Sequence, residues 1–264
     1  MSIPTKCDYL IIGAGIHGLS TAWHLCQKLA KKGQLKENSV VVLEKSQVAS
    51  GASGVACGIV RNNYYQPAMR HLMDHSVKVW NANAEALTYK PVGYMQINSQ
   101  LMHEGMSEVY HQQKEIGFES DFIEGEADCN KYMKELLPDW QAQGITSVLH
   151  EKKTGYGANR GAIEGFHKLA VSAGAKICEG VTVTSLNTSS GSQAIKSVET
   201  SEGTIECDQV VVAAGPWVRN FWEMLDLPKT IKIKKPDGSF TDDLKMWSYM
   251  ALEEGELDVD PYSY

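Results

Sequence analysis

The sequence lacks any apolar run that approaches the roughly 18 residues of a membrane-spanning helix. Its first seven residues carry one lysine and no apolar segment, so we expect no targeting signal. Basic residues are also in deficit, 25 against 32 acidic ones, and the formal net charge is -7. Such a balance argues against nucleic acid or an anionic membrane as the main partner.

Cysteine motifs and metal-ligand patterns are missing as well. The six cysteines show no C-x-x-C motif and no paired spacing. Buried reduced thiols are therefore expected, and they favour a reducing, cytoplasmic compartment. His71 and His75 have the spacing of a helical metal pair, but no third ligand follows at a recognisable distance, so we predict no metal site. We find no internal repeat and no low-complexity segment.

What the sequence does contain is an ordinary globular composition. Of its 264 residues, 43% are hydrophobic and 22% are charged. This length allows one large domain or two intertwined smaller ones, each with a buried core.

The first 44 residues have the pattern of a β-α-β unit. Residues 8–12 form a nearly continuous apolar run, which is typical of a buried parallel strand. Apolar residues then recur at helical spacing over residues 19–30, and Gly33 ends that helix. Residues 39–43, SVVVL, predict a second buried strand, and Glu44 stands at its carboxyl end.

The turn between the first strand and the helix matches G-x-G-x-x-G. Gly13 permits a tight turn, Gly15 allows a pyrophosphate to approach the backbone, and Gly18 allows close packing of helix on strand. The amino end of the helix adds N–H donors and a positive dipole end. We predict dinucleotide binding; the alternative is a glycine turn with only a packing role.

Glu44 is expected to accept hydrogen bonds from the adenosine ribose. A carboxylate at this position would repel a 2′-phosphate, so NADP is disfavoured, although the neighbouring Lys45 weakens the argument. NAD and FAD both remain open at this point. Two further stretches favour FAD: the small-residue loop 50–61, SGASGVACGIVR, and the strand end 210–217, VVVAAGPW. A plain strand-to-helix turn is the alternative for the second stretch.

The rest of the chain alternates helical and strand patterns, and its character changes near residue 88 and near residue 147. Helices are predicted at 69–84, 101–116, 126–137 and 163–173; strands are predicted at 94–97, 118–123, 175–179 and 181–186, with a hairpin of 196–200 and 204–207 and a buried strand at 209–212.

Four segments in this order, DYLIIGAGIHGLSTAWHL, VVVLEK, SGASGVACGIVR and DQVVVAAGPW, resemble the FAD-dependent D-amino-acid oxidase superfamily. The resemblance is greatest to its sarcosine oxidase, glycine oxidase and dimethylglycine dehydrogenase branch, and it extends from Asp8 to about Trp217. It implies an α/β fold in which a Rossmann-like FAD-binding domain, residues 1–88 and 147–222, is interleaved with an α+β substrate domain built on an antiparallel sheet, residues 89–146 and 223–264.

The resemblance also implies site residues, position by position. The implied FAD contacts are Gly13, Gly15, Ile16, His17, Gly18, Glu44, Lys45, Ala52, Ser53, Gly58, Ile59, Val183, Ala214, Gly215 and Trp217. Arg61 matches an arginine that holds the substrate carboxylate, which suits a guanidinium because it binds carboxylates through two parallel hydrogen bonds. The alternative for Arg61 is a surface salt bridge. Tyr64 is a second candidate for substrate binding, with aromatic packing as its alternative, and Tyr249 is placed by position only. No catalytic residue is assigned.

The implied activity is oxidation of the C–N bond of a small amino acid or N-methyl amino acid, with hydride transfer to flavin N5. Alternatives are an FAD-dependent 2-hydroxy-acid dehydrogenase, an NAD-dependent dehydrogenase and a non-catalytic FAD-binding subunit or fragment. Members of the family usually continue into a second glycine-rich stretch that is not found here. We therefore expect either a missing C-terminal segment or a completing subunit.

Overall fold

The computed structural model describes residues 3–188, 194–232, 237–240 and 244–245. The chain forms two compact units: unit 1 comprises residues 1–54 and 166–264, and unit 2 comprises residues 55–165. Unit 2 is therefore inserted into unit 1 along the sequence. The functional division predicted above, with boundaries at 88/89, 146/147 and 222/223, stays a prediction.

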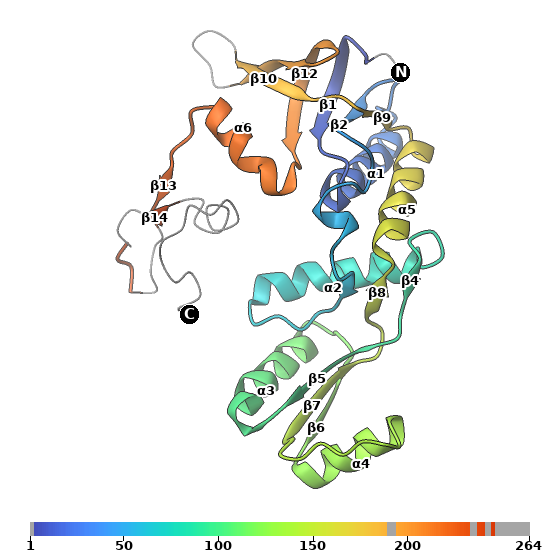
Figure 1. Cartoon of the computed structure of the whole chain (residues 1–264), viewed down its shortest axis with the longest axis vertical. Helices are drawn as coiled ribbons and strands as arrows, with labels where there is room; N and C mark the ends of the chain where they lie inside the picture. Colours follow the sequence, from blue (N-terminus) through green and yellow to red (C-terminus); the bar gives the residue numbers. More distant parts are fainter. Residues whose placement is uncertain (1–2, 189–193, 233–236, 241–243, 246–264) are drawn as a thin grey trace. The chain divides into compact units, whose positions relative to one another are not determined.

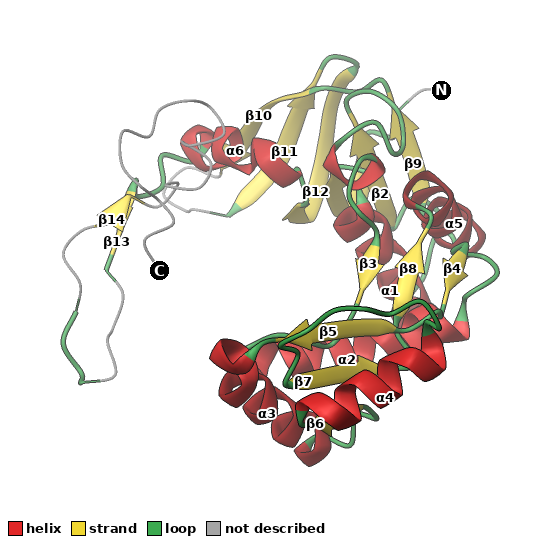
Figure 2. Ribbon diagram, turned by 60° about the horizontal axis from the view of Figure 1, so that its bottom comes forward, coloured by secondary structure: helices red, strands yellow, loops and turns green. Residues whose placement is uncertain are grey.

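Unit 1 is built on a six-stranded sheet in the order β10-β11-β12-β1-β2-β9 (Figures 1 and 2). Its strands are β1 (Lys6–Ile12), β2 (Val40–Glu44), β9 (Lys176–Glu179), β10 (Val183–Thr188), β11 (Ile195–Thr200) and β12 (Gly203–Val212). Strands β12, β1, β2 and β9 run parallel, whereas β10, β11 and β12 form an antiparallel meander. This confirms the predicted mixed α/β class.

The first β-α-β unit forms because its strands are apolar on both faces. Leu10 and Val41 are completely buried, as expected for central parallel strands. Helix α1 (Ile16–Lys31) buries Leu19 and Cys26 on its sheet-facing side and ends with lysines in its last turn. Helix α5 (Asn159–Ser172) contributes Phe166, whose ring meets Trp23 of α1 edge-on at 5.9 Å between centroids.

Strand β12 differs from the prediction in two ways. The second hairpin strand and the later VVV run are one continuous strand of ten residues. Val210 and Val212 were predicted to be buried but are only partly so. Side chains alternate along a strand, so Val210 and Val212 pack on the core from one face while Val211 lies on the other. Unit 1 continues through η2 (Gly215–Trp217), α6 (Val218–Met224), β13 (Thr230–Ile231) and β14 (Leu244–Lys245).

Unit 2 contains two three-stranded antiparallel sheets. One has the order β3-β8-β4, formed by β3 (Ile59–Val60), β8 (Gly155–Gly157) and β4 (Tyr89–Lys90). The other has the order β5-β7-β6, formed by β5 (Tyr94–Asn98), β7 (Ser147–Glu151) and β6 (Asp121–Glu124). The helices are α2 (Pro67–Ala82), α3 (Gln100–Glu115) and α4 (Glu126–Leu136). Alternation along β7 sends Leu149 to the α3 side and Val148 to the α4 side, so each helix covers one face.

All six cysteines are free thiols. Five are buried as predicted, but Cys57 is exposed because it lies in the small-residue loop and packs in no core. Within the described ranges, no helix is both long enough and apolar enough to cross a membrane.

Candidate functional site

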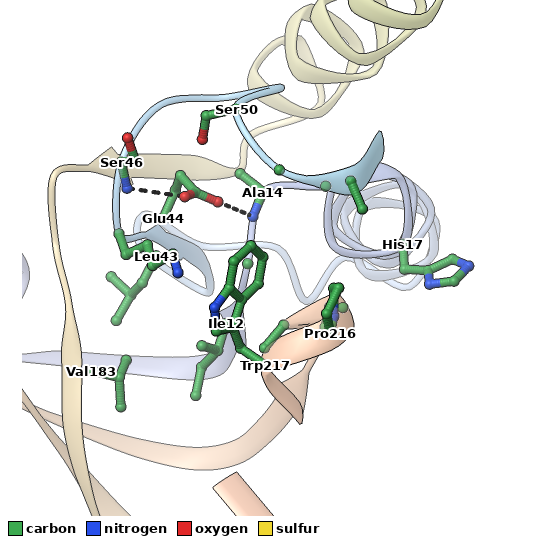
Figure 3. Close-up of a pocket in the computed structure, with 18 of the residues that line it drawn as sticks. Ile12, Ala14, His17, Leu43, Glu44, Ser46, Ser50, Val183, Pro216 and Trp217 are labelled. Atoms are coloured by element: carbon green, nitrogen blue, oxygen red, sulfur yellow. Dashed lines mark hydrogen bonds between the residues drawn. The ribbon is translucent and has the colours of Figure 1, made fainter. Parts of the chain in front are cut away.

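Unit 1 has a cavity of about 480 Å³ at the carboxyl end of β1. Strands β12, β1 and β2 are parallel neighbours, so their carboxyl ends and the turns that follow them meet at one edge of the sheet. The residues that line the cavity come from these turns, from the start of α1, from the loop 46–53, from the start of β10 and from α6 (Figure 3). In open parallel sheets, ligands bind at such an edge.

The glycine turn has the geometry that its motif predicts. Gly13 has φ +105°, and a Cβ there would overlap the carbonyl oxygen of Ala213, so only glycine fits. Gly18 is buried and does not line the cavity. A Cβ on Gly18 would overlap the carbonyl oxygen of Gly13, and its role is therefore close packing of α1 on β1.

Two backbone N–H groups of the turn are held by side chains. The Ala14 N–H donates to Glu44 Oε2 at 3.0 Å (Figure 3). The Ile16 N–H donates to Ser53 Oγ at 3.1 Å. The remaining N–H groups of the first helical turn have no acceptor four residues back, and the helix dipole is positive at this end. The turn is thus suited to an anionic group such as a phosphate.

Glu44 does more than its predicted role requires. Its second oxygen, Oε1, accepts the N–H of Ser46 at 3.0 Å, so one carboxylate joins the glycine turn to the loop after β2. A carboxylate has about four lone-pair positions, which leaves two for a ligand hydroxyl. This bracing role has no signal in the local sequence, because it depends on a contact between residues 30 positions apart.

Twelve of the predicted cofactor residues line the cavity: Gly13, Gly15, Ile16, His17, Glu44, Lys45, Ala52, Ser53, Val183, Ala214, Gly215 and Trp217. Gly58 and Ile59 do not; they belong to unit 2, where Ile59 is 51% exposed. Asn220, Phe221 and Met224 also line the cavity from α6, and no sequence motif marked them as site residues. Their spacing of one and three residues places them on one face of a helix. That this face borders the cavity follows only from the position of α6 in the fold.

Arg61 lies in unit 2 within a group of aromatic and polar side chains. Its Nη1 donates to the Tyr94 hydroxyl at 2.5 Å, and that hydroxyl donates to Gln96 Oε1 at 2.7 Å. The guanidinium carbon lies 5.0 Å from the ring centroid of Tyr94 and 5.2 Å from that of Tyr64. Among the described residues, no carboxylate lies within 4.0 Å of Arg61, so the salt-bridge alternative has no support. Tyr249 lies outside the described residues.

A buried hydrogen-bond network holds the chain next to Arg61. Glu151 is fully buried, and its carboxylate accepts the Asn62 N–H at 2.8 Å and Gln113 Nε2 at 2.6 Å. Burial raises the pKa of Glu151, and its hydrogen bonds and the charge of Arg61 oppose this shift only in part. Asn62 Nδ2 in turn donates to the Arg70 carbonyl at 2.7 Å. Nothing in the sequence pattern distinguished Glu151 from an ordinary strand-end carboxylate.

The sequence matches the model of one protein family over most of its length. The model of the FAD dependent oxidoreductase family matches residues 8–240, and this chain belongs to that family. Dependence on FAD defines this family, which confirms the predicted cofactor and the predicted family.

Individual relatives are distant. The chain is 25% identical over 211 residues to sarcosine oxidase subunit beta from Rhizobium meliloti, covering 78% of this chain and 49% of the relative. It is 28% identical to human mitochondrial dimethylglycine dehydrogenase, covering 84% and 25%. The crystal structure of L-proline dehydrogenase from P. horikoshii superposes with a TM-score of 0.74 at 22% identity, covering 89% and 63%, and shows the same fold. The chain thus spans about half the length, or less, of these curated relatives.

Proposed function

We propose that this chain binds FAD in the unit 1 cavity and belongs to an enzyme that oxidises the C–N bond of a small amino acid or N-methyl amino acid. The observation that supports the cofactor most directly is the glycine turn, which presents N–H groups to the same cavity as Glu44. Relatives named sarcosine oxidase and dimethylglycine dehydrogenase support the substrate class.

In this proposal, the N–H groups of the turn that are not bonded to Glu44 or Ser53 bind the pyrophosphate together with the Ser53 hydroxyl, and Glu44 accepts hydrogen bonds from the ribose. Val183 and the apolar side chains of α6 contact the adenine. When bound, FAD would supply the electron acceptor for a hydride equivalent from the carbon next to the substrate nitrogen. No residue of this chain is proposed as a general acid or base.

Arg61 is proposed to bind the substrate carboxylate, with Tyr94 and Tyr64 fixing the plane of the guanidinium. Nη1 already donates to Tyr94, so the other guanidinium N–H groups are the ones available to the substrate. A fixed guanidinium loses less side-chain entropy on binding than a mobile one.

A longer protein or a partner is part of the proposal, because the match covers only 49% and 25% of two relatives and one of them is a subunit. We propose that a further segment or a second subunit completes the flavin-ring side of the site. A cytoplasmic location stays a prediction.

One observation keeps a second substrate class open: Arg61 would hold the carboxylate of a 2-hydroxy acid equally well. The test is to reconstitute the full-length protein with FAD and mix it without oxygen with sarcosine, dimethylglycine, glycine, proline or 2-hydroxyglutarate. Bleaching of the flavin absorbance by an amino acid supports the proposal. Bleaching only by the hydroxy acid would favour the second class, and bleaching by none would favour a non-catalytic subunit.

A further inference from the structure

The Lys45 ammonium lies 3.5 Å from the ring centroid of Trp217, and both residues line the unit 1 cavity. Lys45 follows β2, whereas Trp217 lies in η2 just after β12. Strand β1 separates these two strands in the sheet, so the contact spans the carboxyl end of β1, where the glycine turn begins. Figure 3 shows the Trp217 indole directed into the cavity, toward the side of Ala14 and Glu44.

The cavity has both apolar and polar lining. Val183 and Phe221 are buried and Met224 adds a third apolar side chain. Glu44 and the N–H groups of the glycine turn supply polar groups in the same cavity. A ligand with a flat aromatic group joined to an anionic group matches this lining, with its ring beside Trp217 and its anion at the turn.

Lys45 now occupies the ring face that such a ligand would use. Both members of the pair are exposed, Trp217 by 42%, and an exposed cation–π contact favours its bound state by only about two- to fivefold. Stacking of a nucleobase on an aromatic side chain contributes about five- to 150-fold. A purine can therefore displace the ammonium with a net gain.

We propose that Trp217 is the stacking residue for the adenine base and that Lys45 covers its ring face until the nucleotide arrives. This inference rests on FAD binding in this cavity. It adds that Lys45 competes with the base, so loss of the ammonium strengthens binding of an uncharged adenine ligand. Adenosine is the suitable probe because it has no phosphates, and removal of a positive charge cannot weaken its attraction to the site.

The experiment measures competition of adenosine against FAD on the full chain, using flavin fluorescence anisotropy. Lys45→Met is expected to strengthen adenosine binding about two- to fivefold. Trp217→Leu is expected to weaken it at least fivefold, and Trp217→Phe, which keeps a ring, is expected to restore most of the loss. Lys168→Met removes an exposed lysine of α5 that does not line the cavity and is expected to change nothing.

The outcomes separate the two proposals. If the wild-type chain binds FAD but Lys45→Met leaves adenosine affinity unchanged or lowers it, Lys45 does not compete with the base. FAD binding then still stands. If Trp217→Leu binds adenosine as tightly as wild type, the stacking role is wrong. If the wild-type chain binds no FAD at all, the cofactor proposal itself fails. Lys45→Met changes an exposed side chain, so its result does not depend on the folding of the Trp217 variants.

Discussion

Glu44 Oε2 accepts the Ala14 N–H at 3.0 Å, which ties the end of the second strand to the glycine turn that follows the first. The same side chain is proposed to hold the ribose of FAD. It therefore has two functions, one in the protein without ligand and one in the complex.

The first prediction concerns Glu44→Gln, which keeps the shape of the side chain and removes its charge. Its amide nitrogen would face one of two backbone N–H groups, Ala14 or Ser46, and two donors cannot bond each other. Hydrogen bonds to charged groups contribute about 1.5–3 kcal/mol, so FAD affinity should fall about ten- to 100-fold. Calorimetric titration with FAD measures it, and Glu202→Gln, at an exposed turn, is the matched control. Equal affinity in both variants would contradict the role of Glu44.

A second prediction tests the packing role of Gly18. Gly18→Ala places a methyl group on the carbonyl oxygen of Gly13, and neither backbone segment moves without disturbing α1 or β1. We expect the free energy of unfolding to fall by at least about 3 kcal/mol, the upper part of the range for overpacking. At Gly51 the nearest atom to an added Cβ belongs to Trp217, at 3.7 Å, so Gly51→Ala should change stability by no more than about 0.5 kcal/mol. Urea unfolding measures the free energy of unfolding of both variants. Similar losses in Gly18→Ala and Gly51→Ala would argue against a specific clash at Gly18.

The third prediction uses the raised pKa of Glu151. The folded protein keeps this proton to higher pH than the unfolded chain does. The free energy of unfolding should therefore fall as pH rises from the ordinary carboxyl range through the raised folded pKa, by at most about 1.4 kcal/mol per pH unit from this group. Glu151→Gln should flatten that part of the profile. Glu164→Gln, at an exposed position on α5, should keep the wild-type profile. An unchanged profile in Glu151→Gln would mean that Glu151 titrates normally.

A fourth prediction addresses the proposed carboxylate site. Arg61→Lys replaces a planar fork by a point charge, so the KM for an N-methyl amino acid should rise about tenfold or more. Tyr94→Phe removes the hydroxyl that accepts from Arg61 and should raise KM by a smaller factor. The matched substrate is the same amine without its carboxylate, whose KM should not change. If the KM values of both substrates rise by the same factor, Arg61 supports the fold and does not bind the carboxylate.

Local patterns predicted the first β-α-β unit well. Residues 8–12, the glycine turn and residues 39–43 are close in sequence, and each carries its own signal of apolarity or backbone freedom. The pairing of β1 with β12 was out of reach, because Lys6 and Glu206 meet across 200 residues. The prediction that Val210 and Val212 are buried was wrong, because the exposure of a strand depends on which distant segments cover it.

The contacts of the site also divide into those that the local sequence indicates and those that depend on distant segments meeting. The sequence indicated Glu44 and Arg61 through residue type and position. It did not indicate Ser53 as an acceptor for the helix start, Tyr94 as the partner of Arg61, or Glu151 as a buried support. Each of these is a pairwise contact between distant segments, and neither composition nor periodicity records such pairs.

Isothermal titration calorimetry of the full-length apoprotein with FAD is the most direct test of whether the unit 1 cavity binds this cofactor. We expect saturation at one FAD per chain, competition by ADP, and clearly weaker binding in Glu44→Gln. Heat of dilution alone in the folded wild-type protein, with no saturation by FAD or ADP, would contradict this expectation.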